Sequence, residues 1–190
     1  MPHSEPKPLT AVGFLTVVKH EQHGFFGGYL LLNVNSRPIE FHCTAPVKPN
    51  RAQEILYGPT LEPYLFGEQI GQALISKTKT KPIAVCTDLA TVLAAREFVP
   101  LPLALVHDPG QNASVSPTPA TPQWRIDASH DQPGLITFQL GRNLLGVPSG
   151  RDDDRAELSE RLSAIADHLD LAEPFERIRS AIEEAQRAGR

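Results

Sequence analysis

Two histidines, His20 and His23, stand three residues apart in a turn-like segment near the start of the chain, and His42 and Cys43 follow on a later predicted strand. Imidazole and thiolate groups are ligands for zinc and other transition metals. The spacing differs from the metalloprotease pattern, in which two histidines lie four apart on a helix with a glutamate between them. Alternation along a strand sends His42 and Cys43 to opposite faces, so only one can join the turn. The alternative is a solvated turn with the cysteine in the core.

Acidic residues give a second candidate site. Asp88 follows residues 82–86, an apolar run typical of a strand buried on both faces. Glu40, Glu62 and Glu68 are the acids that a fold could bring near it. A carboxylate at this point also caps the start of the next helix, which is the simpler interpretation.

A third candidate is an anion-binding site between the third predicted strand and the first predicted helix. Lys48 and Arg51 provide two cations beside a helix start, where free backbone amides point outward. Tyr57 and Thr60 add neutral hydrogen-bonding groups, so these four residues could hold a carboxylate or phosphate without a metal. The alternative is a surface turn with ordinary solvated charges.

The last predicted helix, residues 171–190, offers a protein-binding site. Phe175, Ile178 and Ile182 recur at helical spacing and form an apolar stripe beside charged residues. Such a stripe packs on the chain's own core or docks on another protein. Core packing is the default interpretation, and the three residues are candidate partner contacts if this surface stays uncovered.

The elements that must position these residues begin with three predicted strands. Residues 12–19, 25–33 and 39–44 are rich in β-branched and aromatic side chains, which predicts an antiparallel meander. Gly27 and Gly28 inside the second strand predict a bulge or a close backbone approach. The third strand should place alternate residues on opposite faces: Ile39, Phe41 and Cys43 on one, and Glu40, His42 and Thr44 on the other.

A helix, strand, helix and strand follow the meander. Apolar spacing predicts, in order, helices at 51–56 and 60–76, a strand at 82–86, a helix at 89–98 and a strand at 101–106. Asn50 and Thr60 are the expected N-caps of the first two helices. Gly67 and Gly71 lie four apart on the second helix, where they would let it lie close against a sheet. The last β-α-β step predicts parallel strands, so the sheet should be mixed.

This order of elements resembles the start of ribonuclease H-like nucleases. The resemblance implies a metal-dependent phosphoryl-transfer site. Those enzymes keep a metal-binding aspartate in the first strand, whereas residues 13–19, GFLTVVK, contain no acid. Two-metal chemistry would lack its central ligand, so the resemblance covers topology alone and leaves open an inactivated version of the fold.

A break in composition separates the sheet from the C-terminal part. The segment 109–122 is rich in proline, serine and threonine, which predicts an exposed linker. Alternation at 124–128 and 136–140 predicts a hairpin with a turn near Pro133 and Gly134. The expected organisation is a flexible N-terminus (1–10), a mixed-sheet core domain (11–108), the linker (109–122), and a β-hairpin plus helical pair (123–190).

Composition and charge argue against several classes of protein. The 190 residues are 41% hydrophobic and 21% charged, as in folded globular domains, and the formal net charge of −4 gives no general attraction to nucleic acid. Residues 1–8 lack the apolar core of a signal peptide, and no apolar run approaches the roughly 20 residues that span a bilayer. We therefore expect a cytoplasmic protein without membrane contact. Cys43 and Cys86 fall in apolar patterns and are expected to be buried and reduced.

These observations favour an α+β fold with a mixed β-sheet, in which a three-strand antiparallel meander precedes helix-strand-helix-strand and then a C-terminal hairpin and two helices. No residue pair provides a nucleophile with an adjacent base, and no motif specifies a cofactor. We expect a non-enzymatic cytoplasmic binding or assembly module that acts through protein-protein contacts, with a protein partner or by self-association. The alternative is a metal-dependent hydrolase or nuclease that uses His20, His23 and Asp88 with zinc or another divalent metal.

Overall fold

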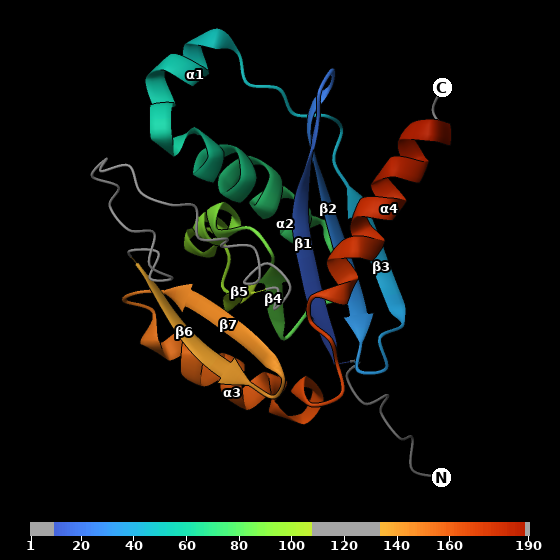
Figure 1. Ribbon diagram of the computed structural model, residues 1–190, viewed down its shortest axis with the longest axis vertical. Helices are drawn as coiled ribbons and strands as arrows, with labels where there is room; N and C mark the ends of the chain where they lie inside the picture. Colours follow the sequence, from blue (N-terminus) through green and yellow to red (C-terminus); the bar gives the residue numbers. More distant parts are fainter. Residues whose placement is uncertain (1–9, 108–133, 189–190) are drawn as a thin grey trace, which may run out of the picture.

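A seven-stranded mixed sheet, in the order β3-β2-β1-β4-β5-β7-β6, forms the centre of the protein (Figure 1). The structure is a computed structural model and describes residues 10–107 and 134–188. Its strands are β1 (Ala11–His20), β2 (Gly24–Asn33), β3 (Pro38–Cys43), β4 (Ala84–Thr87), β5 (Leu103–His107), β6 (Leu135–Leu140) and β7 (Asn143–Pro148). The predicted α+β class and mixed sheet are confirmed.

Strand directions follow the predicted plan. β1, β2 and β3 form an antiparallel meander, β4 lies parallel to β1, and β5 lies parallel to β4. β7 pairs antiparallel with β5, and β6 pairs antiparallel with β7, so the C-terminal strands extend the same sheet.

The C-terminal hairpin differs from the expected one in its strand pairing. Its strands are β6 and β7, which are joined by a turn at Gly141 with a positive φ of 56°. The expected strand at 124–128 lies outside the described residues, as do the linker at 109–122 and most of the N-terminal segment. The division of the chain into domains therefore stays a prediction.

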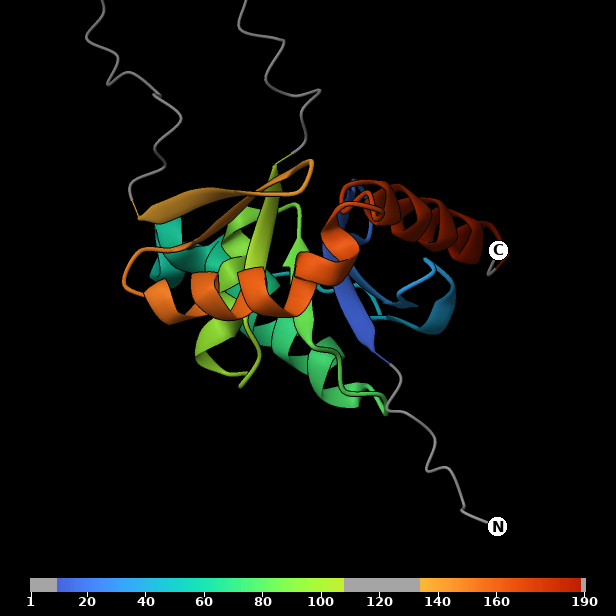
Figure 2. The same ribbon diagram turned by 90° about the horizontal axis from the view of Figure 1, so that it is seen from below.

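Helices cover both faces of the sheet. The helical elements of the described residues are α1 (Arg51–Tyr57), the 3-10 turn η1 (Gly58–Thr60), the π-helix η2 (Pro63–Gln72), α2 (Ala73–Lys77), the 3-10 helix η3 (Ala90–Glu97), α3 (Asp152–Ala166) and α4 (Glu173–Ala188), and all but α1 and η1 contribute to this cover. One core cluster contains side chains of α3 and α4, and a second contains side chains of η2, α2 and η3. The sheet lies between these two layers (Figures 1 and 2).

The glycine pair on β2 brings helices close to both faces of the sheet. A Cβ on Gly28 would overlap Ile178 of α4, and a Cβ on Gly27 would overlap Ile70 of η2. The expected close approach is confirmed at these two residues. A larger side chain at either position would push a helix away from the sheet.

The glycines of η2 have a different neighbour from the one expected. A Cβ on Gly67 would lie 2.7 Å from the Cβ of Ala94, and one on Gly71 would lie 3.1 Å from the Cβ of Ala95. Both alanines belong to η3. Gly67 and Gly71 therefore let two helices pack together on one face of the sheet, which corrects the expected packing against the sheet itself.

A register shift in the pairing of β2 with β3 leaves Ile39 of β3 without a partner residue and changes the expected faces of that strand. The shift lies between Leu31 and Leu32. Phe41 remains opposite Leu30, on the side of α4, whereas Ile39 packs with the opposite core cluster. Strict alternation along β3 was therefore wrong for Ile39, because an irregular pairing lies between it and Phe41.

Candidate protein-contact site

Local interactions define the start and the end of helix α1. The side-chain oxygen of Asn50 accepts from the backbone amide of Gln53 at 2.9 Å, and the Gln53 side chain accepts from the Asn50 amide at 3.0 Å. This reciprocal capping box fixes the first turn. Gly58, with a positive φ of 49°, ends the helix. The N-cap predicted at Asn50 is confirmed.

Among the described residues, α1 has no buried side chain. Ile55 and Leu56 are 66% and 82% exposed, more than any other large hydrophobic residue in that part of the chain. Ala52 is also exposed and lies three and four positions before them, on the same helical face. Figure 1 shows α1 standing away from the sheet. An apolar stripe is therefore presented on a preformed, projecting helix.

A pair of tyrosines anchors the end of α1. The rings of Tyr57 and Tyr64 stack with centroids 4.1 Å apart and an angle of 18° between their planes. The amide of Gln69 donates to the Tyr64 hydroxyl at 2.7 Å. Hydrogen bonding with Tyr64 raises the pKa of Tyr57. The stack ties α1 to the start of η2 and so limits how the stripe can move.

The four residues expected at an anion site make mostly local contacts. Arg51 pairs with Glu54 at 3.0 Å, and the Thr60 hydroxyl donates to the backbone carbonyl of Tyr57 at 2.8 Å. Thr60 thus lies in the turn before the long helix and is not its N-cap, which corrects that expectation. Lys48 is exposed. The anion site stays a prediction.

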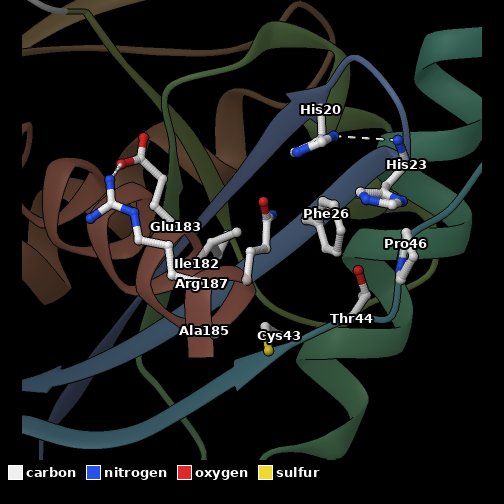
Figure 3. Close-up of a pocket in the computed structure, with 11 residues that line it drawn as sticks. His20, His23, Phe26, Cys43, Thr44, Pro46, Ile182, Glu183, Ala185 and Arg187 are labelled. Carbon is white, nitrogen blue, oxygen red and sulfur yellow. Dashed lines mark hydrogen bonds and ion pairs between the residues drawn. The ribbon is translucent and has the colours of Figure 1, made fainter. Parts of the chain in front are cut away.

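A pocket of about 710 Å³ lies between the β1-β2 turn and the end of α4 (Figure 3). We call it the turn pocket. From the sheet side it is lined by His20, His23, Phe26, Cys43, Thr44 and Pro46. From α4 it is lined by Ile182, Glu183, Ala185, Gln186 and Arg187. Cys43 is exposed there, which corrects its expected burial, and Thr44 reaches the same pocket.

The side chain of His20 organises the backbone of the turn. Nδ1 of His20 accepts from the amides of Gln22 at 3.2 Å and His23 at 3.3 Å. The His20 and His23 rings lie 4.6 Å apart between centroids. Within residues 10–107 and 134–188, no three His, Cys, Asp or Glu side chains form a group suited to a metal ion. The turn pocket brings Cys43, and not Asp88, beside these histidines.

Asp88 contacts α4 instead of capping a helix. Its carboxylate pairs with the guanidinium of Arg179. The amide of Leu89, at the start of η3, donates to the Thr87 hydroxyl at 3.2 Å. Asp88 therefore fastens α4 to the end of β4, which corrects its expected role as a cap. Arg179 also pairs with Glu176 at 2.5 Å.

The carboxylate of Glu40, on β3, makes a structural contact with the loop after α2. Its carboxylate accepts from the amides of Lys79 at 3.1 Å and Thr80 at 2.7 Å, and lies 3.0 Å from Nε2 of His42. These hydrogen bonds, with Thr80 the largest contributor, lower the pKa of Glu40 to about 2. Glu40 thus joins the edge strand to the loop after α2. It does not join Asp88.

The apolar stripe of α4 lies inside the protein. Phe175, Ile178 and Ile182 are 2%, 0% and 2% exposed. The rings of Phe175 and Phe14 meet edge to face with centroids 5.8 Å apart. These three residues were candidate partner contacts, with core packing as the default interpretation, and the structure buries them against β1 and β2. Because Gly28 has no side chain, Ile178 of α4 can lie close to β2, which allows this packing.

The exposed stripe on α1 was not singled out from the sequence. Its signal was an adjacent apolar pair, Ile55 and Leu56, on a helix of seven residues that proline and glycine close off. Such a helix has little opportunity to turn an apolar face toward a core.

No protein-family model matches this chain, and no curated protein matches it. The residues and contacts described above are therefore the basis for inferring function.

Proposed function

We propose that this chain is a non-enzymatic binding or assembly module that acts through protein-protein contacts made by α1. The observation that supports this proposal is the exposure of Ile55 and Leu56, at 66% and 82%. Burying one such side chain stabilises a complex by about 1.5–3 kcal/mol. An exposed apolar pair on a capped, tyrosine-anchored helix is therefore well suited to an apolar groove on a protein.

The charges of α1 favour a protein partner over a phosphate-rich surface. Arg51 and Glu54 neutralise each other at 3.0 Å, so the helix has no cluster of cations for nucleic acid or anionic lipid. Ala52, Ile55 and Leu56 have the i, i+3, i+4 spacing by which short helices dock in protein grooves.

A cytoplasmic location is part of the proposal. Cys43 and Cys86 are both free thiols, which is usual for proteins of reducing compartments. In the described part of the chain, no helix combines the length and the apolar character needed to cross a membrane.

The hydrolase alternative has weaker support. It requires His20, His23 and Asp88 to act together on a metal. Asp88 is paired with Arg179, and the histidines line a pocket that does not include Asp88. We therefore retain the binding function as the proposal.

The native size of the chain in an extract of its own cells tests this function. The wild-type chain is expected in an assembly larger than its 20.8 kDa monomer. Leu56→Asp should shift it to monomer size, because a carboxylate cannot enter an apolar groove without a desolvation cost. Ala164→Asp, an equivalent change at an exposed position of α3, should leave the size unchanged. Monomer size for the wild type would refute the proposal.

A further inference from the structure

We propose that the partner of α1 is a second copy of this chain, whose turn pocket receives Ile55 and Leu56. This inference rests on the proposed function and adds the identity of the partner and of its receiving surface. It joins two features that lie on the same chain: a projecting apolar helix and an open pocket with an apolar interior.

The turn pocket is chemically suited to aliphatic side chains. Phe26 of β2 and Pro46 in the segment after β3 line it on one side, and Ile182 and Ala185 line it from α4. Figure 3 shows the ring of Phe26 between the histidine turn and the helix. When apolar side chains enter this space, apolar surface on both partners is removed from water. This removal is the main driving force of association.

The size of the pocket sets what can enter it. A volume of about 710 Å³ is within the range of sites that enclose a small ligand, and it is too small for a whole helix with its side chains. Two neighbouring side chains at the tip of a helix are a suitable occupant. α1 presents such a pair, and its seven residues keep the rest of the helix outside the pocket.

Charges on the two surfaces are complementary. Glu183 and Arg187 lie on the α4 side of the pocket, 3.8 Å apart, with 62% and 73% of their side chains exposed. Arg51 and Glu54 flank the stripe on α1. Each surface thus offers one cation and one anion, so Arg51 can meet Glu183 while Glu54 meets Arg187. Such rim pairs orient a contact more than they strengthen it.

The position of both surfaces on one chain permits reciprocal exchange. In a two-fold dimer, each copy inserts α1 into the turn pocket of the other, so the same contact occurs twice. This arrangement buries both apolar stripes and leaves neither pocket open.

Sedimentation of the purified full chain over a range of concentrations tests the inference. The wild type is expected to move from 20.8 kDa toward twice that mass as its concentration rises. Leu56→Asp removes the inserting side chain, and Ala185→Arg fills the pocket from an exposed helix position. Each variant alone should remain monomeric, and at low concentration, where the wild type is also monomeric, it should keep the wild-type melting temperature, since both positions lie outside the core.

A mixture of the two variants gives the most specific result. The Ala185→Arg chain retains an intact α1, and the Leu56→Asp chain retains an intact turn pocket. An equimolar mixture should therefore form a one-to-one dimer through one intact contact, weaker than the wild-type dimer with its two contacts, although neither variant associates alone.

Three results would overturn this inference: a wild-type chain that is monomeric at every concentration, a variant that still dimerises alone, or a mixture that stays monomeric. If the purified chain is a monomer but belongs to a larger assembly in cell extract, the partner that binds α1 is a different protein. In that case the self-association inference fails and the proposed function survives.

Discussion

Helices α1 and α4 both have apolar residues at helical spacing, but only one of them is covered. On α4, Phe175 and Ile178 are buried against the sheet, whereas Ile55 and Leu56 on α1 are 66% and 82% exposed. The comparison shows that an apolar stripe does not by itself identify a binding surface. What decides is whether the fold supplies a matching face.

The fold supplies that face to α4 through β2. Gly28 removes the side chain that would meet Ile178, so α4 can lie directly on the meander. α1 has no such platform: the chain makes a last bridge to β2 at Val47, and none of the side chains of α1 is buried. Its structure depends on the Asn50 capping box and on the stack of Tyr57 with Tyr64.

The largest expected effect is a difference in stability between a truncation on α4 and a truncation on α1. Phe175→Ala should lower the free energy of unfolding by about 3–5 kcal/mol, because it leaves a cavity in the core. Leu56→Ala should change it by less than about 0.5 kcal/mol, as at ordinary surface positions. Denaturant unfolding of the monomeric chain at low concentration measures both. Similar losses for the two variants would contradict the contrast between α1 and α4.

A smaller effect is expected where α4 meets β2. Gly28→Ala adds a methyl group that overlaps Ile178, and overpacking of this kind costs about 1–3 kcal/mol. Ile178→Ala removes the nearest overlapping atom and leaves Cδ1 of Ile182 at 2.9 Å, so the double variant should lose less stability than the sum of the two single variants. A double-mutant cycle by denaturant unfolding provides the check. Strict additivity would mean that the two positions do not meet.

Acid is expected to weaken the contact that Glu40 makes between the edge strand and the loop after α2. Folding lowers the pKa of Glu40 to about 2 from its ordinary value of 4.5. Ionised Glu40 therefore stabilises the folded state fully at pH values above about 4.5. This contribution should be lost progressively as the pH falls from about 4.5 through about 2. Melting temperatures of the wild type and Glu40→Gln should therefore differ at neutral pH and converge in acid. A constant difference over this range would exclude the proposed linkage.

Sequence patterning predicted most of the fold for identifiable reasons. The β-branched runs of residues 12–19 and 25–33 and the helical spacing on residues 171–190 are local signals, and the sheet and α4 follow them. The register shift at Leu31 and Leu32 has no such signal, so the face of Ile39 was wrong.

The candidate site was harder to predict, because exposure and pairing depend on the assembled fold. The pairing of Asp88 with Arg179 joins residues 91 positions apart, which no spacing rule connects. Cys43 looks like a core residue in its strand, but it lies on an edge strand beside an open pocket. Ile55 and Leu56 have ordinary helical spacing, and only the finished fold leaves them uncovered.

Site-specific photo-crosslinking in cells tests the central claim most directly. A photoreactive amino acid at position 56 of the full chain should give covalent adducts with protein, whether a second copy or another partner. The same group at position 160, an exposed site on α3, should give few or none. Adducts at position 56 that disappear with Ile55→Asp are the predicted result. No adducts at position 56, or equal adducts at both positions, would contradict α1 as the contact surface.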